Sequence, residues 1–254
     1  MIPFERQQMM LKLLESGEVV SLDTLMAEIP DISESTIRRD LKALEANDQI
    51  TLLRGGGVCL KHSTSFDVPV SSKTERNVNE KERIAKKAAS FVKDGDSIFL
   101  DSGSTVLCML PYLQNKKVTI VTTNVMVPQR MQQLQSNDIS CIILGGNLKV
   151  STGSTIGTMT NDALRQYFFD EAFIGISGIS DRAGMSTPDD REAEKKRIAV
   201  RNSRRSYILT DSSKMGITTM CKVFELGEVP VICDKAIEPV LSTGNYIIAD
   251  EETE

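Results

Sequence analysis

The sequence has few of the residues from which metal sites and disulfide frameworks are built. His62 is its one histidine, which excludes a histidine-based catalytic triad and a multi-histidine metal site. Its five cysteines are widely spaced and include no C-x-x-C pair, which argues against a structural zinc site and a disulfide scaffold. Most of them lie in apolar runs, so we expect buried, reduced thiols in a reducing cytoplasm and no bound metal or cofactor.

Long apolar segments are also missing. No run approaches the roughly 20 residues that a membrane-spanning helix needs, and residues 1–10 lack the apolar centre of a signal peptide. We therefore expect a soluble, cytoplasmic protein with no membrane partner. The 254 residues, 40% of them hydrophobic, can bury a core without metals or disulfides, and they suffice for one large domain or two ordinary ones.

An excess of positive charge is missing as well. The formal net charge is -5 at pH 7, and duplex DNA repels a chain of that charge at long range. If the chain binds DNA, it must therefore do so through a local basic patch.

Residues 1–60 are predicted to form a small domain of three helices and a hairpin. Apolar residues at helical spacing predict the helices, and Ser21 and Ser33 are predicted to cap the second and third. Two short extended runs, joined through a turn over residues 54–57 that contains three glycines, predict the hairpin. This order of elements is typical of a winged helix-turn-helix domain that binds DNA.

The third predicted helix has two different faces. Ile37, Leu41 and Leu44 share one sector of the helical wheel, and polar and basic residues lie roughly opposite. A helix of this size fits the major groove, where arginine pairs with guanine, whereas the alternative is an ordinary solvated face. The predicted DNA-binding residues, including two from the hairpin turn that would hold phosphates, are Ser33, Ser35, Thr36, Arg38, Arg39, Lys42, Arg54 and Gly55.

Residues 61–78 are polar and are predicted to be a linker, and residues 79–254 are predicted to be an effector-binding domain. After a charged helix over residues 79–93, short apolar runs alternate with helical patterns. This alternation predicts an α/β domain with a mostly parallel, Rossmann-like sheet and helices on both faces. The predicted strands are 97–100, 118–121, 141–144, 172–176, 207–209, 231–233 and 246–249.

An anion-binding loop is predicted where the first of these strands ends. Residues 101–105 offer free amides and hydroxyls at a helix start, and Gly103 permits a close approach of the backbone; a plain helix cap is the alternative. Ligands of open parallel sheets lie at the carboxyl ends of the strands. The predicted effector-binding residues are Asp101, Ser102, Gly103, Ser104, Thr105, Thr123, Asn124, Gly145, Gly146, Asp211 and Lys214.

This set of hydroxyl, amide, glycine and cationic groups suits a phosphorylated polyol. Lys214 would balance a phosphate, unless it is an ordinary surface lysine, and Asp101 and Asp211 would accept sugar hydroxyls, unless they only cap loops. Glu192, Lys195 and Lys196 lie in a charged helix predicted over residues 189–202. We interpret them as a solvated face with ion pairs between successive turns.

The stretch Thr36–Leu41, T-I-R-R-D-L, together with residues 20–25, resembles the helix-turn-helix of DeoR-type bacterial regulators. The wing departs from that family, because Leu52 and Arg54 stand where the family has arginine and histidine. The resemblance continues to about Asp234 through the motifs at the predicted strand ends. It implies a repressor of a sugar or sugar-derivative catabolic operon, which binds double-stranded operator DNA. It also implies a sensor domain similar in fold to ribose-5-phosphate isomerase, with a phosphorylated sugar or sugar acid as effector.

Two other functions are alternatives to the regulator. A sugar-phosphate isomerase or transferase with an accessory domain needs a poised carboxylate, but nothing in the sequence shows that Asp101, Glu192 and Asp211 converge, and a winged helix is hard to explain on an enzyme. A protein–protein adaptor is the other alternative. We therefore predict a regulator that is not an enzyme, and a homodimer or homotetramer, because one winged helix buries too little surface for tight binding.

Overall fold

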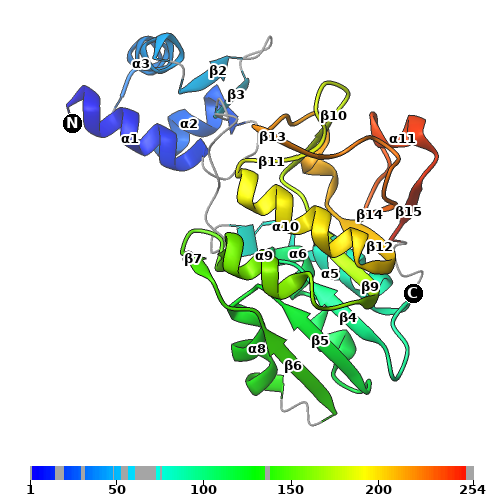
Figure 1. Ribbon diagram of the computed structural model, residues 1–254. Helices are drawn as coiled ribbons and strands as arrows, with labels where there is room; N and C mark the ends of the chain where they lie inside the picture. Colours follow the sequence, from blue (N-terminus) through cyan, green and yellow to red (C-terminus); the bar gives the residue numbers. More distant parts are fainter. Residues whose placement is uncertain are drawn as a thin grey trace. The chain divides into compact units, whose positions relative to one another are not determined.

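The computed structural model describes residues 2–14, 20–29, 32–47, 49–52, 57–60, 73–74, 76–134 and 138–249. The chain divides into two compact units, Met1–Ser63 and Thr64–Glu254 (Figure 1). The predicted domain boundaries at residues 60 and 78 stay a prediction, because residues 61–72 lie outside the described part of the chain.

Unit 1 has the predicted three helices and hairpin, with one additional short strand. Ser21 and Ser33 cap the second and third helices as predicted, by accepting hydrogen bonds from Thr24 N at 3.0 Å and Thr36 N at 3.4 Å. The additional strand β1 pairs with β3, so the antiparallel sheet has the order β1-β3-β2. The elements are α1 Pro3–Leu14, β1 Val20–Ser21, α2 Leu22–Glu28, α3 Glu34–Ala46, β2 Ile50–Leu52 and β3 Gly57–Leu60.

Among the described residues of unit 1, the core is apolar except for one buried ion pair. Side chains from all three helices, among them Leu14, Leu25 and Ile37, are fully buried against one another. Arg6 of α1 and Asp40 of α3 are also buried, and Arg6 Nε donates to Asp40 Oδ2 at 2.7 Å. This pair joins the first helix to the predicted DNA-reading helix.

Unit 2 is the predicted α/β domain. Its main sheet has seven strands in the order β15-β14-β12-β9-β4-β5-β6, and every neighbouring pair is parallel. The elements of the main sheet and its helices are α5 Val78–Ala89, β4 Ser97–Leu100, α6 Ser104–Leu107, α7 Leu110–Leu113, β5 Val118–Thr122, α8 Met126–Leu134, β6 Ile139–Ile143, α9 Thr158–Leu164, β9 Phe169–Gly175, α10 Asp190–Arg201, β12 Ser203–Leu209, β14 Val231–Cys233, α11 Val240–Thr243 and β15 Tyr246–Ile248.

Each of the seven predicted strands overlaps one strand of this sheet, so the predicted fold class is confirmed. The smaller strands were not predicted: a hairpin, and an antiparallel sheet of order β10-β11-β13. A 3-10 turn, η1, follows β12. These elements are β7 Asn147–Lys149, β8 Ser154–Ile156, β10 Gly178–Ser180, β11 Gly184–Thr187, η1 Ser212–Lys214 and β13 Cys221–Phe224.

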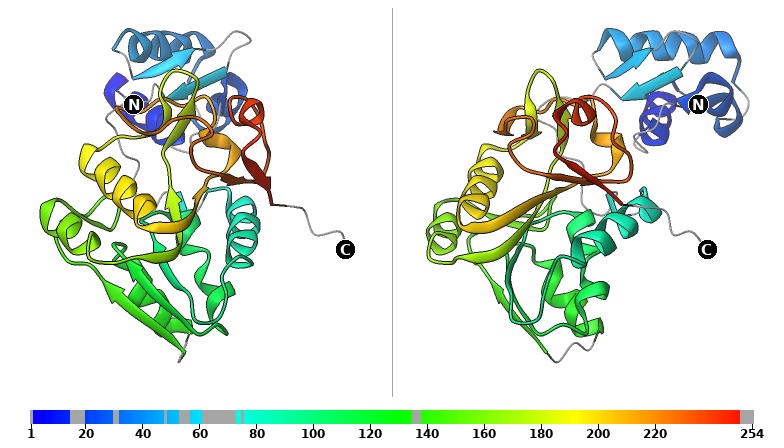
Figure 2. Two further views of the ribbon diagram at one scale, coloured as in Figure 1. Left: turned by 45° about the vertical axis from the view of Figure 1, so that its right-hand side comes forward. Right: turned by 90° about the vertical axis from the view of Figure 1, so that its right-hand side faces the viewer.

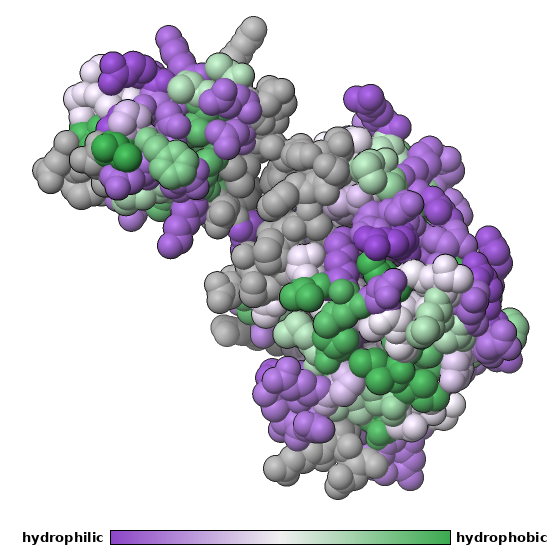
Figure 3. Space-filling model, turned by 60° about the vertical axis from the view of Figure 1, so that its left-hand side comes forward, coloured by the Kyte–Doolittle hydropathy of each residue, from purple (hydrophilic) through white to green (hydrophobic). Residues whose placement is uncertain are grey.

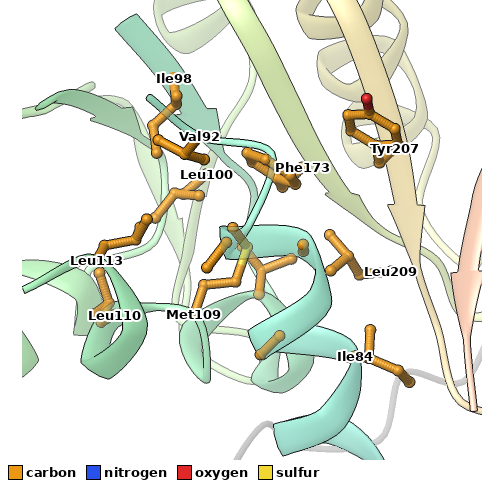
Figure 4. Close-up of a cluster of buried hydrophobic side chains, with 14 of the residues drawn as sticks. Ile84, Val92, Ile98, Leu100, Met109, Leu110, Leu113, Phe173, Tyr207 and Leu209 are labelled. Carbon is orange, nitrogen blue, oxygen red and sulfur yellow. The ribbon is translucent and has the colours of Figure 1, made fainter. Parts of the chain in front are cut away.

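Helices cover both faces of the main sheet (Figure 2). Along β4, Ile98 and Leu100 face the core shared with α5, α6 and α7, whereas Phe99 faces the core shared with α9 and α10. In the first core, Phe173 and Tyr207 stack at 5.8 Å between ring centroids beside these helices (Figure 4). Burying a side chain of this size contributes about 1.5–3 kcal/mol, so the sheet is a firm support for the loops at its carboxyl end.

The predictions about cysteines and membrane segments can be compared with the described residues. The four cysteines whose side chains are described, Cys108, Cys141, Cys221 and Cys233, are free thiols, as predicted, but of these only Cys233 is buried and the other three are half-buried. None of the described helices combines the length and the apolar character needed to span a bilayer.

Candidate DNA-binding and effector sites

The two faces predicted for the third helix are present in α3. Ile37, Leu41 and Leu44 are buried, whereas Arg38, Arg39 and Lys42 are exposed, as is Ser35. The exposed basic face is therefore available to a polyanion, while the apolar face fixes the helix to its own domain.

Some of the predicted DNA-contact residues in and just before α3 already bond to other side chains. The Ser33 hydroxyl lies 2.9 Å from the Thr36 hydroxyl and 3.0 Å from the Ser35 hydroxyl, so these residues already form a hydrogen-bonded cap. Arg38 pairs with Glu34 at 2.7 Å, and because both side chains are more than half exposed, the pair is weak and readily exchanged for a phosphate or a base. The predicted wing residues Arg54 and Gly55 lie outside the described residues.

In unit 2, Asp101 lies at the end of β4, where it meets two lysines of α10. The ammonium groups of Lys195 and Lys196 both pair with the Asp101 carboxylate, Lys195 at 3.3 Å. Lys195 also pairs with Glu192 at 2.6 Å. We call Asp101, Glu192, Lys195 and Lys196 the charged cluster; it holds two carboxylates and two ammonium groups.

The interpretation of Glu192, Lys195 and Lys196 as a solvated face was wrong. Their side chains pair between successive turns of α10 as expected, but they are only 3%, 0% and 4% exposed. The reason is that this face of α10 is turned toward the carboxyl end of β4, where Asp101 is buried too. The sequence does contain one hint of this burial. α10 has few apolar residues, so it must bury charged side chains if it packs on a sheet.

Hydroxyl groups continue the charged cluster toward neighbouring strands. Lys195 donates to the Ser102 hydroxyl at 3.2 Å and to the Ser154 hydroxyl of β8 at 2.6 Å. The ammonium groups also set the ionisation of Glu192: burial by itself would raise its pKa, but Lys195 and Lys196 outweigh burial and lower the pKa to about 2. Glu192 is therefore ionised at neutral pH, and the charged cluster can offer both donors and acceptors to a polyhydroxylated molecule.

The predicted residues at the end of β5 adjoin this cluster. Asn124 forms a β-bridge with Ser154, whose hydroxyl contacts Lys195. Thr123 and Asn124 are fully buried, yet Thr123 Oγ1 and Asn124 Nδ2 have no hydrogen-bond partner within the described residues. Buried polar atoms are rarely left unpaired, so these two atoms make Thr123 and Asn124 candidate ligand contacts.

The predicted glycines have two different roles. Gly103 has φ +145°, and a Cβ there would meet nothing within 4 Å, so the loop is open at this point. Gly146 is constrained by packing instead, because a Cβ would lie 1.9 Å from Thr160 Oγ1. The Thr160 hydroxyl also donates to Gly145 O at 2.9 Å, so Gly145 and Gly146 attach the loop to α9. The predicted anion loop itself opens only a one-turn helix, α6, whose dipole is small.

The last predicted loop, Asp211–Lys214, contacts the segment that precedes α5. Asn77 Nδ2 donates to the Asp211 carboxylate at 3.0 Å and to the Ser213 hydroxyl at 3.2 Å. Lys214 is half-buried; burial lowers its pKa, and of its charged neighbours Asp211 opposes that shift while Lys73, Lys81 and Arg76 add to it.

Sequence reasoning missed the basic residues on this side of the site. Lys81 is buried at the start of α5 and donates to the backbone carbonyls of Lys73 and Arg76. Its position was detectable, because Lys81 begins the stripe continued by Ile84 and Ala88 at helical spacing. The structure thus brings cations to two places at the carboxyl end of the sheet, around Asp101 and around Asp211.

Comparison with known proteins identifies both units. The DeoR-like helix-turn-helix domain matches residues 6–63, and the DeoR C terminal sensor domain matches residues 76–235. The chain is 35% identical over 246 residues to the uncharacterized HTH-type transcriptional regulator FruR of Bacillus subtilis, with 97% of this chain and 96% of that protein covered. It is 31% identical to the glycerol-3-phosphate regulon repressor of Escherichia coli, with 93% and 92% covered.

Among solved structures, ribose 5-phosphate isomerase A from Methanocaldococcus jannaschii is similar at 22% identity and a TM-score of 0.40, over 55% of each chain. The two family matches together span most of the sequence, and the relatives in sequence are aligned over nearly their whole length. The chain belongs to the DeoR family of transcriptional regulators, and it is a DNA-binding regulator rather than an enzyme.

Proposed function

We propose that this regulator represses a sugar or sugar-derivative catabolic operon, and that a phosphorylated sugar or sugar acid bound in unit 2 controls its affinity for operator DNA. The observation that carries the proposal is that Thr123 Oγ1 and Asn124 Nδ2 are buried and unpartnered within the described residues. Asn124 forms a β-bridge with Ser154, whose hydroxyl contacts Lys195 of the charged cluster. A relative of similar length is named as the repressor of the glycerol-3-phosphate regulon, which agrees with a phosphorylated effector.

The chemistry of the carboxyl end fits the two parts of such a molecule. In the charged cluster, carboxylates accept hydrogen bonds from sugar hydroxyls while ammonium groups donate to sugar oxygens. A phosphate carries up to two negative charges and needs several donors, which suits the cations near Asp211. We assign the sugar to the charged cluster and the phosphate to the cations near Asp211.

Asn77 offers a physical route from the effector to the DNA-binding unit. It is the residue before α5, and its φ of +49° is a left-handed conformation that residues other than glycine adopt rarely. Its side chain holds this backbone to Asp211 and Ser213, so a ligand that binds Asp211 also changes the contact of the segment leading to unit 1. Typical coupling of 1–3 kcal/mol changes operator affinity 5–150-fold, provided that the ligand binds one arrangement better than the other.

The DNA-binding part of the proposal is tested by Arg38→Ala and Arg39→Ala. Each change is expected to weaken binding to the operator by roughly 1–3 kcal/mol, because both side chains lie on the exposed face of α3. The operator is first selected from randomised duplexes, and affinity is then measured by fluorescence anisotropy. Arg204→Ala is the control, since Arg204 is an exposed arginine of unit 2. Unchanged affinity in both α3 variants would reject α3 as the recognition helix.

The effector part is tested by Thr123→Val, which replaces the unpartnered hydroxyl with a methyl group of the same shape. Folding stability is expected to stay the same or rise slightly, whereas ligand affinity falls by roughly 0.5–1.5 kcal/mol, or about 2–12-fold. The ligand is found by thermal shift with a panel of triose, pentose and hexose phosphates, since binding at 100 times Kd adds about 2.7 kcal/mol, and the best ligand is titrated by calorimetry.

Thr122→Val is the matched control for this experiment. The Thr122 hydroxyl donates to Leu100 O at 2.6 Å and accepts from Asn124 N at 3.0 Å, so its loss should destabilise the fold by roughly 1–3 kcal/mol. If Thr123→Val destabilises the protein as Thr122→Val does, or binds the sugar phosphate with normal affinity, Thr123 does not contact the effector.

A further inference from the structure

The side chains of the candidate effector site are closed off from solvent. Asp101 and Lys195 of the charged cluster are 0% exposed, and so are Thr123 and Asn124 beside it. Under the proposed function, on which this inference rests, a sugar must reach these groups. Enclosed ligand sites are filled and emptied through the movement of a loop or another small element that covers them. An element that covers the charged cluster must therefore move before a ligand can enter.

The hairpin of β7 and β8, residues 147–156, covers the charged cluster and is separate from the main sheet. Its Thr152 hydroxyl lies 3.5 Å from Glu192 Oε1, and its Ser154 hydroxyl accepts a hydrogen bond from Lys195 at 2.6 Å. Other contacts of the cluster come from α10 itself and from the ends of β4 and β9. Those elements belong to the packed core of unit 2, so the hairpin is the cover that can move by itself.

Polar contacts rather than core packing hold the hairpin in place. None of its residues, all of them described, belongs to either hydrophobic core of unit 2. Leu148 and Val150 are 53% and 80% exposed, and hydrophobic side chains gather on the side of unit 2 that carries β7 and α8 (Figure 3). Thr155 N donates to Thr123 O at 2.8 Å, which connects β8 to the loop after β5. A segment with few buried apolar contacts opens at a lower free energy than the core does.

One ion pair connects the hairpin to the start of α10. Lys149 Nζ lies 3.3 Å from Asp189 Oδ2, and both side chains are largely buried. The hydrogen bond from Arg191 and the charge of Lys149 lower the pKa of the Asp189 carboxyl, so this carboxyl is ionised at neutral pH. Because Arg191 belongs to α10, Lys149 is the partner of Asp189 that links the hairpin to the helix.

We propose that the β7–β8 hairpin is a gate, which turns about Gly146 and Gly157, and that the ion pair of Lys149 and Asp189 holds it closed over the charged cluster. The two glycines lie directly before and directly after the hairpin, with φ of +148° and +96°. Hinges are short segments that absorb large changes of backbone angle. Opening returns the buried charges to water, which offsets part of the contacts that the hairpin loses.

Hydrogen exchange of the full chain, measured by mass spectrometry, tests the ion pair. Lys149→Ala should speed exchange in residues 147–156 by roughly 5–30-fold, which corresponds to about 1–2 kcal/mol, because the hairpin loses its ionic contact with α10. Exchange in β4 and β9 should stay as in the wild type, because these strands lie in the core.

Arg191→Ala is the matched control for Lys149→Ala. Arg191 pairs with the same oxygen of Asp189, at 2.8 Å, but it belongs to α10, so its loss leaves the contacts of the hairpin in place. Hairpin exchange in Arg191→Ala should therefore equal that of the wild type. If Lys149→Ala speeds hairpin exchange no more than Arg191→Ala does, the ion pair does not hold the gate and the proposal is wrong.

Chemical labelling shows whether the gate opens in the wild type, and it needs no effector. An N-hydroxysuccinimide ester acylates lysine amines that reach solvent, whereas Lys195 is completely buried when the hairpin is closed. Relative to the same groups in an unfolded chain, acylation of Lys195 should be slowed much less than exchange of the β4 amides, and less still in Lys149→Ala. Equal slowing of Lys195 and of the β4 amides would mean that the cluster is reached through unfolding of the sheet, which overturns the gate.

A panel of triose, pentose and hexose phosphates connects the gate to the effector. A member of the panel that stabilises the protein in thermal shift should also slow both hairpin exchange and acylation of Lys195, because the closed hairpin encloses it. A member that stabilises the protein and changes neither rate would show that ligand enters by another route, against the proposal. If no member binds, the proposed function fails, while the labelling without ligand still decides whether the hairpin opens.

Discussion

Lys195→Ala is expected to lower the free energy of unfolding of unit 2 by about 3–5 kcal/mol. Lys195 is completely buried and pairs with both Glu192 and Asp101. Its removal leaves two carboxylates in a buried place with Lys196 as the one remaining ammonium group of the charged cluster. The measurement is urea unfolding followed by circular dichroism at pH 7.

Lys222→Ala is the control for this experiment, because Lys222 pairs with Glu225 through side chains that are 46% and 70% exposed. Its expected cost is at most about 1 kcal/mol. A cost for Lys195→Ala as small as that of Lys222→Ala would show that the charged cluster is hydrated and not buried in solution.

The charged cluster also predicts how the loss of stability in Lys195→Ala depends on pH. The folded pKa of Glu192 is lowered from 4.5 to about 2, so its ionisation contributes stability that is fully present above about pH 4.5 and is lost as the pH falls toward 2. The difference between wild type and Lys195→Ala should therefore narrow over that range. A difference that stays constant between pH 5 and pH 3 would contradict the assignment of Glu192 as an ionised partner of Lys195.

Arg6→Ala is expected to destabilise unit 1 by a similar amount, about 3–5 kcal/mol, because Asp40 would be left as a buried, uncompensated carboxylate. Since Asp40 belongs to α3, operator binding should be lost together with the fold of unit 1. Hydrogen exchange measured by mass spectrometry separates the units: protection should fall in α3 and remain in α10.

A double variant distinguishes the charge from the packing of this pair. Arg6→Met combined with Asp40→Leu removes both charges while keeping apolar volume, and such replacements of buried ion pairs are often neutral or stabilising. We therefore expect the double variant to recover most of the stability lost in Arg6→Ala. If Arg6→Ala costs less than about 1 kcal/mol, water reaches Asp40 and the pair does not hold α1 to α3.

Much of the fold could be predicted because the patterns that specify it are local. The stripe of Ile37, Leu41 and Leu44 repeats within a single helix, and the capping serine Ser33 directly precedes it. The seven strands were predictable because a parallel strand buried on both faces is a short apolar run between polar turns. The pairing of β1 and the small antiparallel strands were not, because strands of two to four residues leave too short a pattern.

The candidate effector site also contains residues that local patterns predict and residues that they do not. The positions of Asp101 and Thr123 were predictable, because each directly follows a strand and strand ends of a parallel sheet share one edge. Lys195 and Lys196 were not, because their burial depends on which face of α10 turns toward β4, some 90 residues earlier in the chain. Helical periodicity places both lysines on one side of α10 but does not say what that side meets.

The sequence alone therefore determined the class of this protein, its two kinds of domain and the basic face of α3, since each depends on residues that are neighbours along the chain. Only the tertiary structure decided which charges are buried. An ammonium group such as that of Lys195 enters the interior only when a carboxylate from a distant strand, here Asp101, is already held there to compensate its lost hydration. Glu192 supplies one carboxylate from the same helix, but Asp101 reaches Lys195 only once β4 and α10 have packed together, so the local pattern does not contain the full compensation.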